Sequence, residues 1–276
     1  MKKLINQYPN KPARLFLGIL PFALLLLLYV LASNARLAEN PNDKLLPSMQ
    51  SFAEAIDRMA FEPNKRSGDY LFWQDTLSSL KRLTMGVGIS ALIALSLGVA
   101  MGAIPYARAK LSPLVTAISL VPPMAILPIL FIIFGLGEVS KVVLIVIGIT
   151  PFMTRDVLQR VMEIPSEQII KAQTLGATTW QIILRVILPQ VMPRLLAAIR
   201  LSLGAAWLFL IAAEAIAATD GLGYRIFLVR RYLSMDVILP YVVWITLLAF
   251  AIDYLLRQAS IKLYPWFHSQ EGKGTA

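Results

Sequence analysis

The chain is 276 residues long, and 57% of them are hydrophobic, more than the roughly 45–50% that is typical of soluble domains. Several apolar runs reach the roughly 20 residues that cross a bilayer as a helix, so the composition excludes a soluble fold, and the lack of ~10-residue alternating segments excludes a β-barrel. The net charge of +10 does not indicate nucleic-acid binding, because most basic residues flank the apolar runs, where they orient a membrane protein.

Six apolar segments predict an all-α, polytopic membrane protein with six transmembrane helices. The first segment follows a basic N-terminus and has no cleavage motif, so we expect a retained span and not a signal peptide. Between the first two segments, residues 48–61 carry apolar side chains at helical spacing, which predicts a surface helix. The expected spans are residues 15–33, 83–105, 113–136, 139–162, 193–217 and 236–259.

The lysine and arginine residues of the short loops predict the orientation of the chain. With six spans, the basic N-terminus, the loop between the fourth and fifth spans and the C-terminal flank all fall on one side. We therefore expect both termini to be cytoplasmic. Arg225, Arg230 and Arg231 fall on the other side and weaken this bias without reversing it.

The third expected span contains Pro122, Pro123 and Pro128, and Met124 lies among them. Proline removes a backbone donor and bends a helix. Within a membrane, the freed carbonyl groups are tolerated where they are buried in protein or line a wet cavity. The prolines therefore indicate either a kink that helps packing or a broken helix beside a translocation path.

A more polar stretch of about twenty residues, from Ile170 to Pro189, interrupts the apolar sequence between the fourth and fifth spans. Gly176 allows a positive φ, which suits a helix end and a sharp turn. Apolar residues recur at helical spacing on both sides, so we expect a short helix, a glycine turn and a second short helix, with Pro189 and Pro193 setting the re-entry. Such a segment either packs under its own bundle or is gripped by a partner outside the membrane.

Two charged residues lie inside the fifth expected span, where charges are functional hypotheses by default. Arg200 either reaches the interface or pairs within the bundle, or it attracts anions near an inner gate. Glu214 either accepts hydrogen bonds from the turn between Ala217 and Gly223 or serves a gate. Asp156, at the end of the fourth span, is expected to orient the following loop.

The sequence shows no catalytic constellation. An intramembrane enzyme needs a cluster such as histidine with aspartate, but the single histidine, His268, lies in the polar tail, where a solvated side chain is expected. The string Gly272-Lys273-Gly274 lacks the spacing of a P-loop. We therefore expect no ATP hydrolysis, no bound cofactor and no metal site in this chain.

The interrupting stretch resembles the EAA loop of permease subunits of binding-protein-dependent ABC importers. That pattern reads E-A-A, three residues, G, nine residues, I-x-L-P. Ala172, Gly176, Leu188 and Pro189 match it, whereas Ile170 and Lys171 replace its Glu and first Ala. Residues 121–141 and 212–226 resemble the nitrate, sulfonate and taurine branch of the same family.

This resemblance implies the fold of a type I importer transmembrane domain at residues 75–262, preceded by one extra helix within residues 1–74 and followed by a tail at residues 263–276. It also implies a homodimer, two separate ATPase subunits that hold ATP and magnesium, and an external solute-binding protein. The function would be uptake of a small solute across the inner membrane of a bacterium, with an anion such as nitrate, a sulfonate, taurine or bicarbonate as the expected solute. A secondary transporter without an ATPase is the alternative, although we see no match between the two halves of the chain.

The resemblance assigns two groups of residues. Asp220, Gly221 and Gly223 would form an external turn that meets the binding protein or lines the outer gate. A loop at residues 172–189 would couple the permease to its ATPase by shape and apolar anchoring. The coupling residues are Ala172, Gln173, Leu175, Gly176, Ala177, Thr178, Trp180, Leu188 and Pro189.

Overall fold

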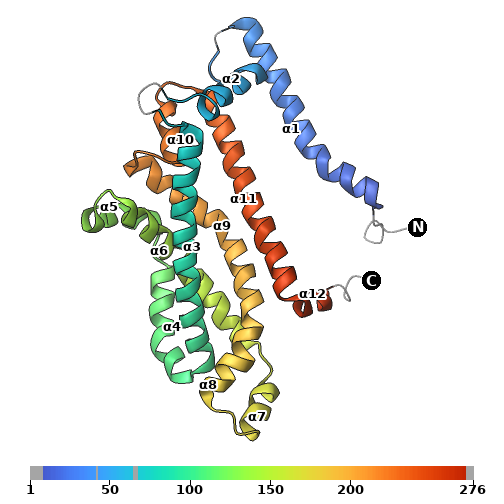
Figure 1. The fold of residues 1–276 in the computed structure, drawn as a ribbon, viewed down its shortest axis with the longest axis vertical. Helices are drawn as coiled ribbons and strands as arrows, with labels where there is room; N and C mark the ends of the chain where they lie inside the picture. Colours follow the sequence, from blue (N-terminus) through green and yellow to red (C-terminus); the bar gives the residue numbers. More distant parts are fainter. Residues whose placement is uncertain (1–8, 42, 65–67, 272–276) are drawn as a thin grey trace. The chain divides into compact units, whose positions relative to one another are not determined.

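The structure, a computed structural model, describes residues 9–41, 43–64 and 68–271, and these contain helices and no strand (Figure 1). The all-α prediction is therefore confirmed for this part of the chain. Parts of both tails lie outside the described residues, including Gly272, Lys273 and Gly274. The helices are α1 (Lys11–Glu39), α2 (Met49–Ala60), α3 (Leu71–Ala103), α4 (Pro105–Ser119), α5 (Pro123–Phe134), α6 (Glu138–Met162), α7 (Ser166–Thr174), α8 (Thr179–Ile182), a π-helical turn (Ile183–Ile187), α9 (Leu188–Ala217), α10 (Leu222–Arg230), α11 (Met235–Leu263) and α12 (Pro265–Glu271).

The chain divides into two units, residues 1–70 with 229–240 and residues 71–228 with 241–276. In the first unit, the expected surface helix is α2, and Ser48 caps its start by accepting a hydrogen bond from the Ser51 N–H. The loop before α2 is held to α1, because the Tyr29 hydroxyl donates to the Pro47 carbonyl at 2.7 Å. The Tyr29 ring also lies 5.8 Å from that of Phe52.

Five described helices are long and apolar enough to cross a membrane, and they include the first, second, fourth, fifth and sixth expected spans. The second is longer than expected, because α3 begins at Leu71 and continues through polar residues that we assigned to a loop. The third expected span is present as two helices and not as one continuous helix. The chain there forms α4 and α5, which meet at an angle of 95°.

The break between α4 and α5 follows from two adjacent prolines. Pro122 lies in an extended conformation before α5, and Pro123 occupies its first turn, where the missing N–H costs nothing. The residue before a proline is pushed out of the helical region, so α4 cannot continue through this site. Of the two readings of these prolines, the structure shows the broken helix. Pro128 lies inside α5.

In the second unit, α3 packs most extensively against α6. Small residues at every fourth position of α3 allow the close approach, as they do at helix interfaces in membranes. A Cβ added to three of its glycines would lie 2.4–2.8 Å from a β-branched side chain of α6. The small residues are Gly86, Ser90, Ala94, Gly98 and Gly102, and the three contacts are Gly86–Ile145, Gly98–Val157 and Gly102–Val161.

The partners in these contacts are always 59 residues apart, so α3 and α6 run parallel and begin at the same end. The chain between Ala103 and Glu138 must therefore return along their shared length. From Gly86 to Gly102 this length is about 24 Å at the helical rise of 1.5 Å per residue. The bent pair α4–α5 carries the chain back to the end where α6 begins. Together the two helices therefore take the place of one membrane crossing.

The second short helix that we expected after Gly176 is not a separate element. Helix α8, the π-helical turn and α9 form one continuous helical stretch from Thr179 to Ala217. The helix therefore runs through Pro189 without a break. In the second unit, α7 and α8 lie at one end and α10 at the other (Figure 1). These are called the α7 end and the α10 end below.

Candidate functional site

The turn after α7 has the hydrogen bonds of a Schellman motif. The Gly176 N–H donates to the Gln173 carbonyl at 2.9 Å, and the Ala177 N–H donates to the Ala172 carbonyl at 3.1 Å. Gly176 has a φ of 81°, as the sequence predicted. Its missing side chain frees the backbone for this conformation, because a Cβ there would meet nothing within 4 Å.

The helical stretch after this turn starts with a capping box. The Thr178 hydroxyl accepts from the Gln181 N–H, and the Gln181 side chain accepts from the Thr178 N–H. The π-helical turn then follows, in which the Leu188 N–H bonds to the Ile183 carbonyl. The π-helical turn ends two residues before Pro189. Proline has no N–H to donate, so the irregular hydrogen bonds of the turn occur where the helix already lacks one bond.

The segment from Ser166 to Pro189, called the coupling segment below, exposes large apolar side chains. No residue of α7 is buried, and Leu175 and Trp180 are 81% and 66% exposed. Both lie beside the Schellman turn, at the α7 end. Exposed aromatic and aliphatic side chains next to a rigid turn are typical of anchors that bind a partner.

One polar contact joins the coupling segment to α9, and a second lies at the end of α6, just before the segment. The Gln190 side chain of α9 donates to the Gln168 side chain of α7 at 3.0 Å. Before α7, Arg160 donates to Glu163 at 2.9 Å. That guanidinium group holds the pKa of the Glu163 carboxyl below its usual value, so the pair stays charged at neutral pH.

At the α10 end, sequence reasoning missed a buried cluster of ionic groups. Its centre is Arg82 of α3, whose side chain is 3% exposed. The guanidinium group makes five hydrogen bonds, which equals its number of donors. Two go to Glu138 at 2.6 and 2.7 Å, one to Glu214 at 2.8 Å, one to the Asp220 side chain at 2.5 Å and one to the Asp220 carbonyl at 2.9 Å.

The same cluster holds the predicted external turn through three successive backbone N–H groups. Gly221 donates to Asp75, Leu222 to the Ser79 hydroxyl, and Gly223 to Glu214, each at 2.9 Å. Glu214 therefore matches the structural interpretation of its role, as an acceptor for this turn. Asp75 and Ser79 precede Arg82 at helical spacing, and this polar stripe was the signal that could have revealed the cluster.

Asp220 keeps its charge within this cluster. Partial burial opposes ionisation, but hydrogen bonds from Ser78 and Arg82 outweigh it and hold the pKa of Asp220 below its usual value. Arg225 of α10 also donates to Asp75, at 2.8 Å. Acidic and basic groups thus alternate, and each buried charge has an oppositely charged partner, which a buried ion requires.

The remaining charged candidate, Arg200, pairs within the bundle. Its guanidinium group donates twice to Asp253 of α11, at 2.7 and 2.9 Å. His268 is not the solvated residue that we expected, because its ring nitrogen Nε2 lies 3.0 Å from the Ser260 hydroxyl. Next to it, Phe267 packs under the Arg194 guanidinium at 4.6 Å. The first contact joins α12 to α11, and the second joins α12 to α9.

The structure thus separates the predicted site residues into four places. Those of the coupling segment lie together at the α7 end, and Glu214, Asp220, Gly221 and Gly223 lie together in the cluster at the α10 end. The proline candidates lie at the break between α4 and α5 and within α5, and Arg200 lies on α9. No group of metal-ligating residues occurs within the described residues.

Comparisons with known proteins agree with this architecture. Residues 83–262 match the family model of the binding-protein-dependent transport system inner membrane component. The taurine transport system permease protein TauC of Escherichia coli is 37% identical over 198 residues, 72% of each chain. A putative aliphatic sulfonates transport permease protein of Bacillus subtilis is 29% identical over 70% of each chain.

Among solved structures, the inward-facing MetNI methionine ABC transporter contains a chain that matches with a TM-score of 0.57 and 24% identity, over 71% of this chain and 99% of that one. This likeness shows the fold of a type I ABC importer transmembrane subunit. No relative in these comparisons supports a secondary transporter. The chain therefore belongs to the binding-protein-dependent transport system inner membrane components, and it is a permease subunit of an ABC importer.

Proposed function

We propose that the coupling segment is where a separate ATPase drives this permease. The observation that carries the proposal is the pair of exposed side chains, Leu175 and Trp180, beside a rigid Schellman turn at the α7 end. Their exposure fits a groove on a partner better than packing under the bundle. ATP and magnesium belong to that partner, and this chain supplies the docking surface and the membrane path.

The working unit would contain two copies of this chain, two ATPase subunits and an external solute-binding protein. The α7 end then faces the cytoplasm of a bacterium, with both termini on the same side of the inner membrane. The α10 end, with its turn at Gly221, faces the binding protein. Closure of the ATPase dimer would move the two coupling segments together and bias the permease between two states.

The solute that this importer carries is proposed to be a small anion. The support comes from relatives, since one is a taurine permease and another an aliphatic sulfonates permease. Selection would rest mainly with the external binding protein. The Arg200 guanidinium group is paired with Asp253, so it is not a free charge for a solute.

Reconstitution of the chain with its ATPase and binding protein tests the coupling. Trp180→Ala should lower solute uptake per ATP hydrolysed and leave thermal stability unchanged, because the side chain is mostly exposed. Phe61→Ala is the matched control, since Phe61 is also 66% exposed but lies outside the coupling segment. Uptake that continues without ATP, or equal coupling in the two variants, would contradict the proposal.

A further inference from the structure

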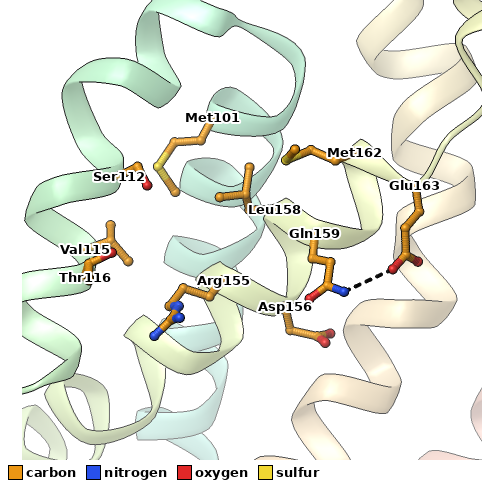
Figure 2. A pocket seen from close by; sticks show the side chains of 10 residues that line it. All are labelled: Met101, Ser112, Val115, Thr116, Arg155, Asp156, Leu158, Gln159, Met162 and Glu163. Carbon is orange, nitrogen blue, oxygen red and sulfur yellow. Dashed lines mark hydrogen bonds between the residues drawn. The ribbon is translucent and has the colours of Figure 1, made fainter.

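A cavity of about 500 Å³ lies between α3, α4 and α6 near the α7 end (Figure 2). This volume falls within the roughly 300–1,000 Å³ of small-molecule pockets. Its walls combine polar groups on α4 and α6 with apolar side chains from all three helices. Glu163, on its rim, lies three residues before α7, so the cavity adjoins the coupling segment without being part of it.

Arg155 is the basic group in the lining of this cavity, and most of its hydrogen-bonding capacity is unused. Its guanidinium group has five donors, but within the described part of the chain it makes one hydrogen bond, a long one of 3.4 Å to the Ser119 hydroxyl. Figure 2 shows its side chain on the same side of the cavity as Thr116 of α4. An arginine with free donors beside a cavity is suited to bind an anionic group with two oxygens.

Two hydroxyl groups on α4 lie near Arg155. Ser112 and Thr116 are four residues apart, so they share one face of the helix, and both line the cavity. Neither hydroxyl bonds to another residue among those that the structure describes. A hydroxyl within a helix often bonds to its own backbone, and these two remain available to a ligand.

Neither acidic residue of the cavity forms an ion pair with Arg155, and both lie beside another arginine. Arg160 lies 3.6 Å from Asp156 and 2.9 Å from Glu163. Gln159 also donates to Glu163, at 3.3 Å (Figure 2). Within the described residues, the Arg155 guanidinium group therefore lines the cavity without an ion pair of its own.

The rest of the wall is apolar and suits a short hydrocarbon chain. Met101, Val115, Leu158 and Met162 line it, and Met101 is fully buried. Methionine side chains adapt to ligands of different shape. A ligand that fills this cavity would therefore have an anionic head and an apolar body.

From these features we infer that the cavity binds a small organic anion, with its acidic head held by Arg155, Ser112 and Thr116 and its hydrocarbon part against the methionine side. The head could belong to a free alkanesulfonate or to the phosphate of a lipid. The chemistry is the same for both, and the site does not depend on the proposed role of the coupling segment.

Calorimetry on the full-length permease in detergent, without ATPase or binding protein, tests this inference. Butane-1-sulfonate is the probe, because it stays ionised and carries an apolar chain, and inorganic sulfate tests the head alone. We expect butane-1-sulfonate to bind more tightly than sulfate, and Arg155→Gln to weaken it at least tenfold. Arg257→Gln, on an exposed arginine of α11 outside the cavity, should leave binding unchanged.

A second arm distinguishes the two sources of the anion. Wild-type and Arg155→Gln permease are purified from membranes with phosphatidylglycerol, and the retained lipid is measured by mass spectrometry. Lipid retained by the wild type and lost in the variant, with no sulfonate binding, would assign the site to a headgroup. Equal sulfonate affinity and equal lipid in both proteins would overturn the inference. Because no ATP is present, that result would leave the coupling proposal untouched.

Discussion

Arg82 and Glu214 form a buried ion pair between helices α3 and α9, with 2.8 Å between Nη1 and Oε1 and 132 residues between them in the chain. Glu214 is fully buried and also receives hydrogen bonds from Ser79 and Gly223. The pair therefore joins α3, α9 and the turn before α10 at one point. Removing either partner would leave the other charged and buried, which is far more costly than the absence of both.

Arg82→Ala should destabilise the permease by about 3–5 kcal/mol, the cost of breaking a buried pair. Arg82→Lys should not restore stability, because an ammonium group has three donors and cannot replace a planar group with five. Thermal unfolding in detergent measures both effects. The control is Arg58→Ala, since Arg58 is exposed and 3.9 Å from Asp236, and its loss should cost less than about 1 kcal/mol. Similar losses in the Arg58 and Arg82 variants would contradict a central role for Arg82.

Gly98→Ala should destabilise the contact between α3 and α6, because the new Cβ would lie 2.5 Å from Val157. The control is Gly204→Ala on α9, where no atom lies within 4 Å, and it should be neutral or stabilising by up to about 1 kcal/mol, since alanine favours helices. Val157→Ala should restore part of the stability that Gly98→Ala removes. The wild type, Gly98→Ala, Val157→Ala and the double variant form a double-mutant cycle of unfolding free energies. Strictly additive effects of the two substitutions would rule out the contact between Gly98 and Val157 as the cause.

Thr154→Val should leave the permease as stable as the wild type or make it more stable. The Thr154 hydroxyl is buried and has no hydrogen-bond partner within the described residues. Removing it therefore removes the free-energy cost of burying a polar group without a hydrogen bond. Ser79→Ala provides the contrast, because that hydroxyl is bonded to Glu214 and to the Leu222 N–H. Losing it should cost about 1–3 kcal/mol. A lower melting temperature for Thr154→Val than for Ser79→Ala would contradict both expectations.

Gly176→Val should reduce ATP-dependent uptake while the bundle remains folded. A β-branched residue is strained at a φ of 81°, where the left-handed conformation costs about 1–2 kcal/mol. Gly176→Asn should retain most activity, because asparagine tolerates this conformation. Since the position is open, bulk is not the cause of any loss. Uptake by the reconstituted importer, measured with melting temperature, separates the two variants, and equal activity in both would remove the turn from the mechanism.

The sequence predicted those elements that depend on local patterns. Apolar length located five spans, and the proline pair Pro122 and Pro123 indicated either a kink or the break that the structure has. Glycine at position 176 predicted the positive φ. These features depend on a few neighbouring residues, and the chemistry of proline and glycine decides them.

The missed features depend on residues that are far apart in the chain. The ion cluster joins Asp75, Arg82, Glu138 and Glu214, and the polar stripe on α3 does not show which distant residues it meets. We assigned Arg82 to a loop because polar residues precede it, although their helical spacing fitted the longer α3. The continuous helix through Pro189 was also missed, because we expected this proline to set the re-entry of the chain into the membrane. Pro189 lies in the first turn of α9, directly after the π-helical turn, where the helix tolerates its missing N–H.

The uninterrupted helix from Thr179 to Ala217 has a mechanical consequence. Its 39 residues span about 58 Å, so a rotation of about 5° at one end displaces the other end by about 5 Å. The helix would therefore transmit a movement at Trp180, near its start, to the part of the helix that Glu214 holds in the ion cluster. The hydrogen bonds along this helix are irregular at the π-helical turn, Ile183–Ile187, and lack a donor at Pro189 and Pro193. Bending is therefore expected between Ile183 and Pro193, and the helix from there to Ala217 should move as one piece.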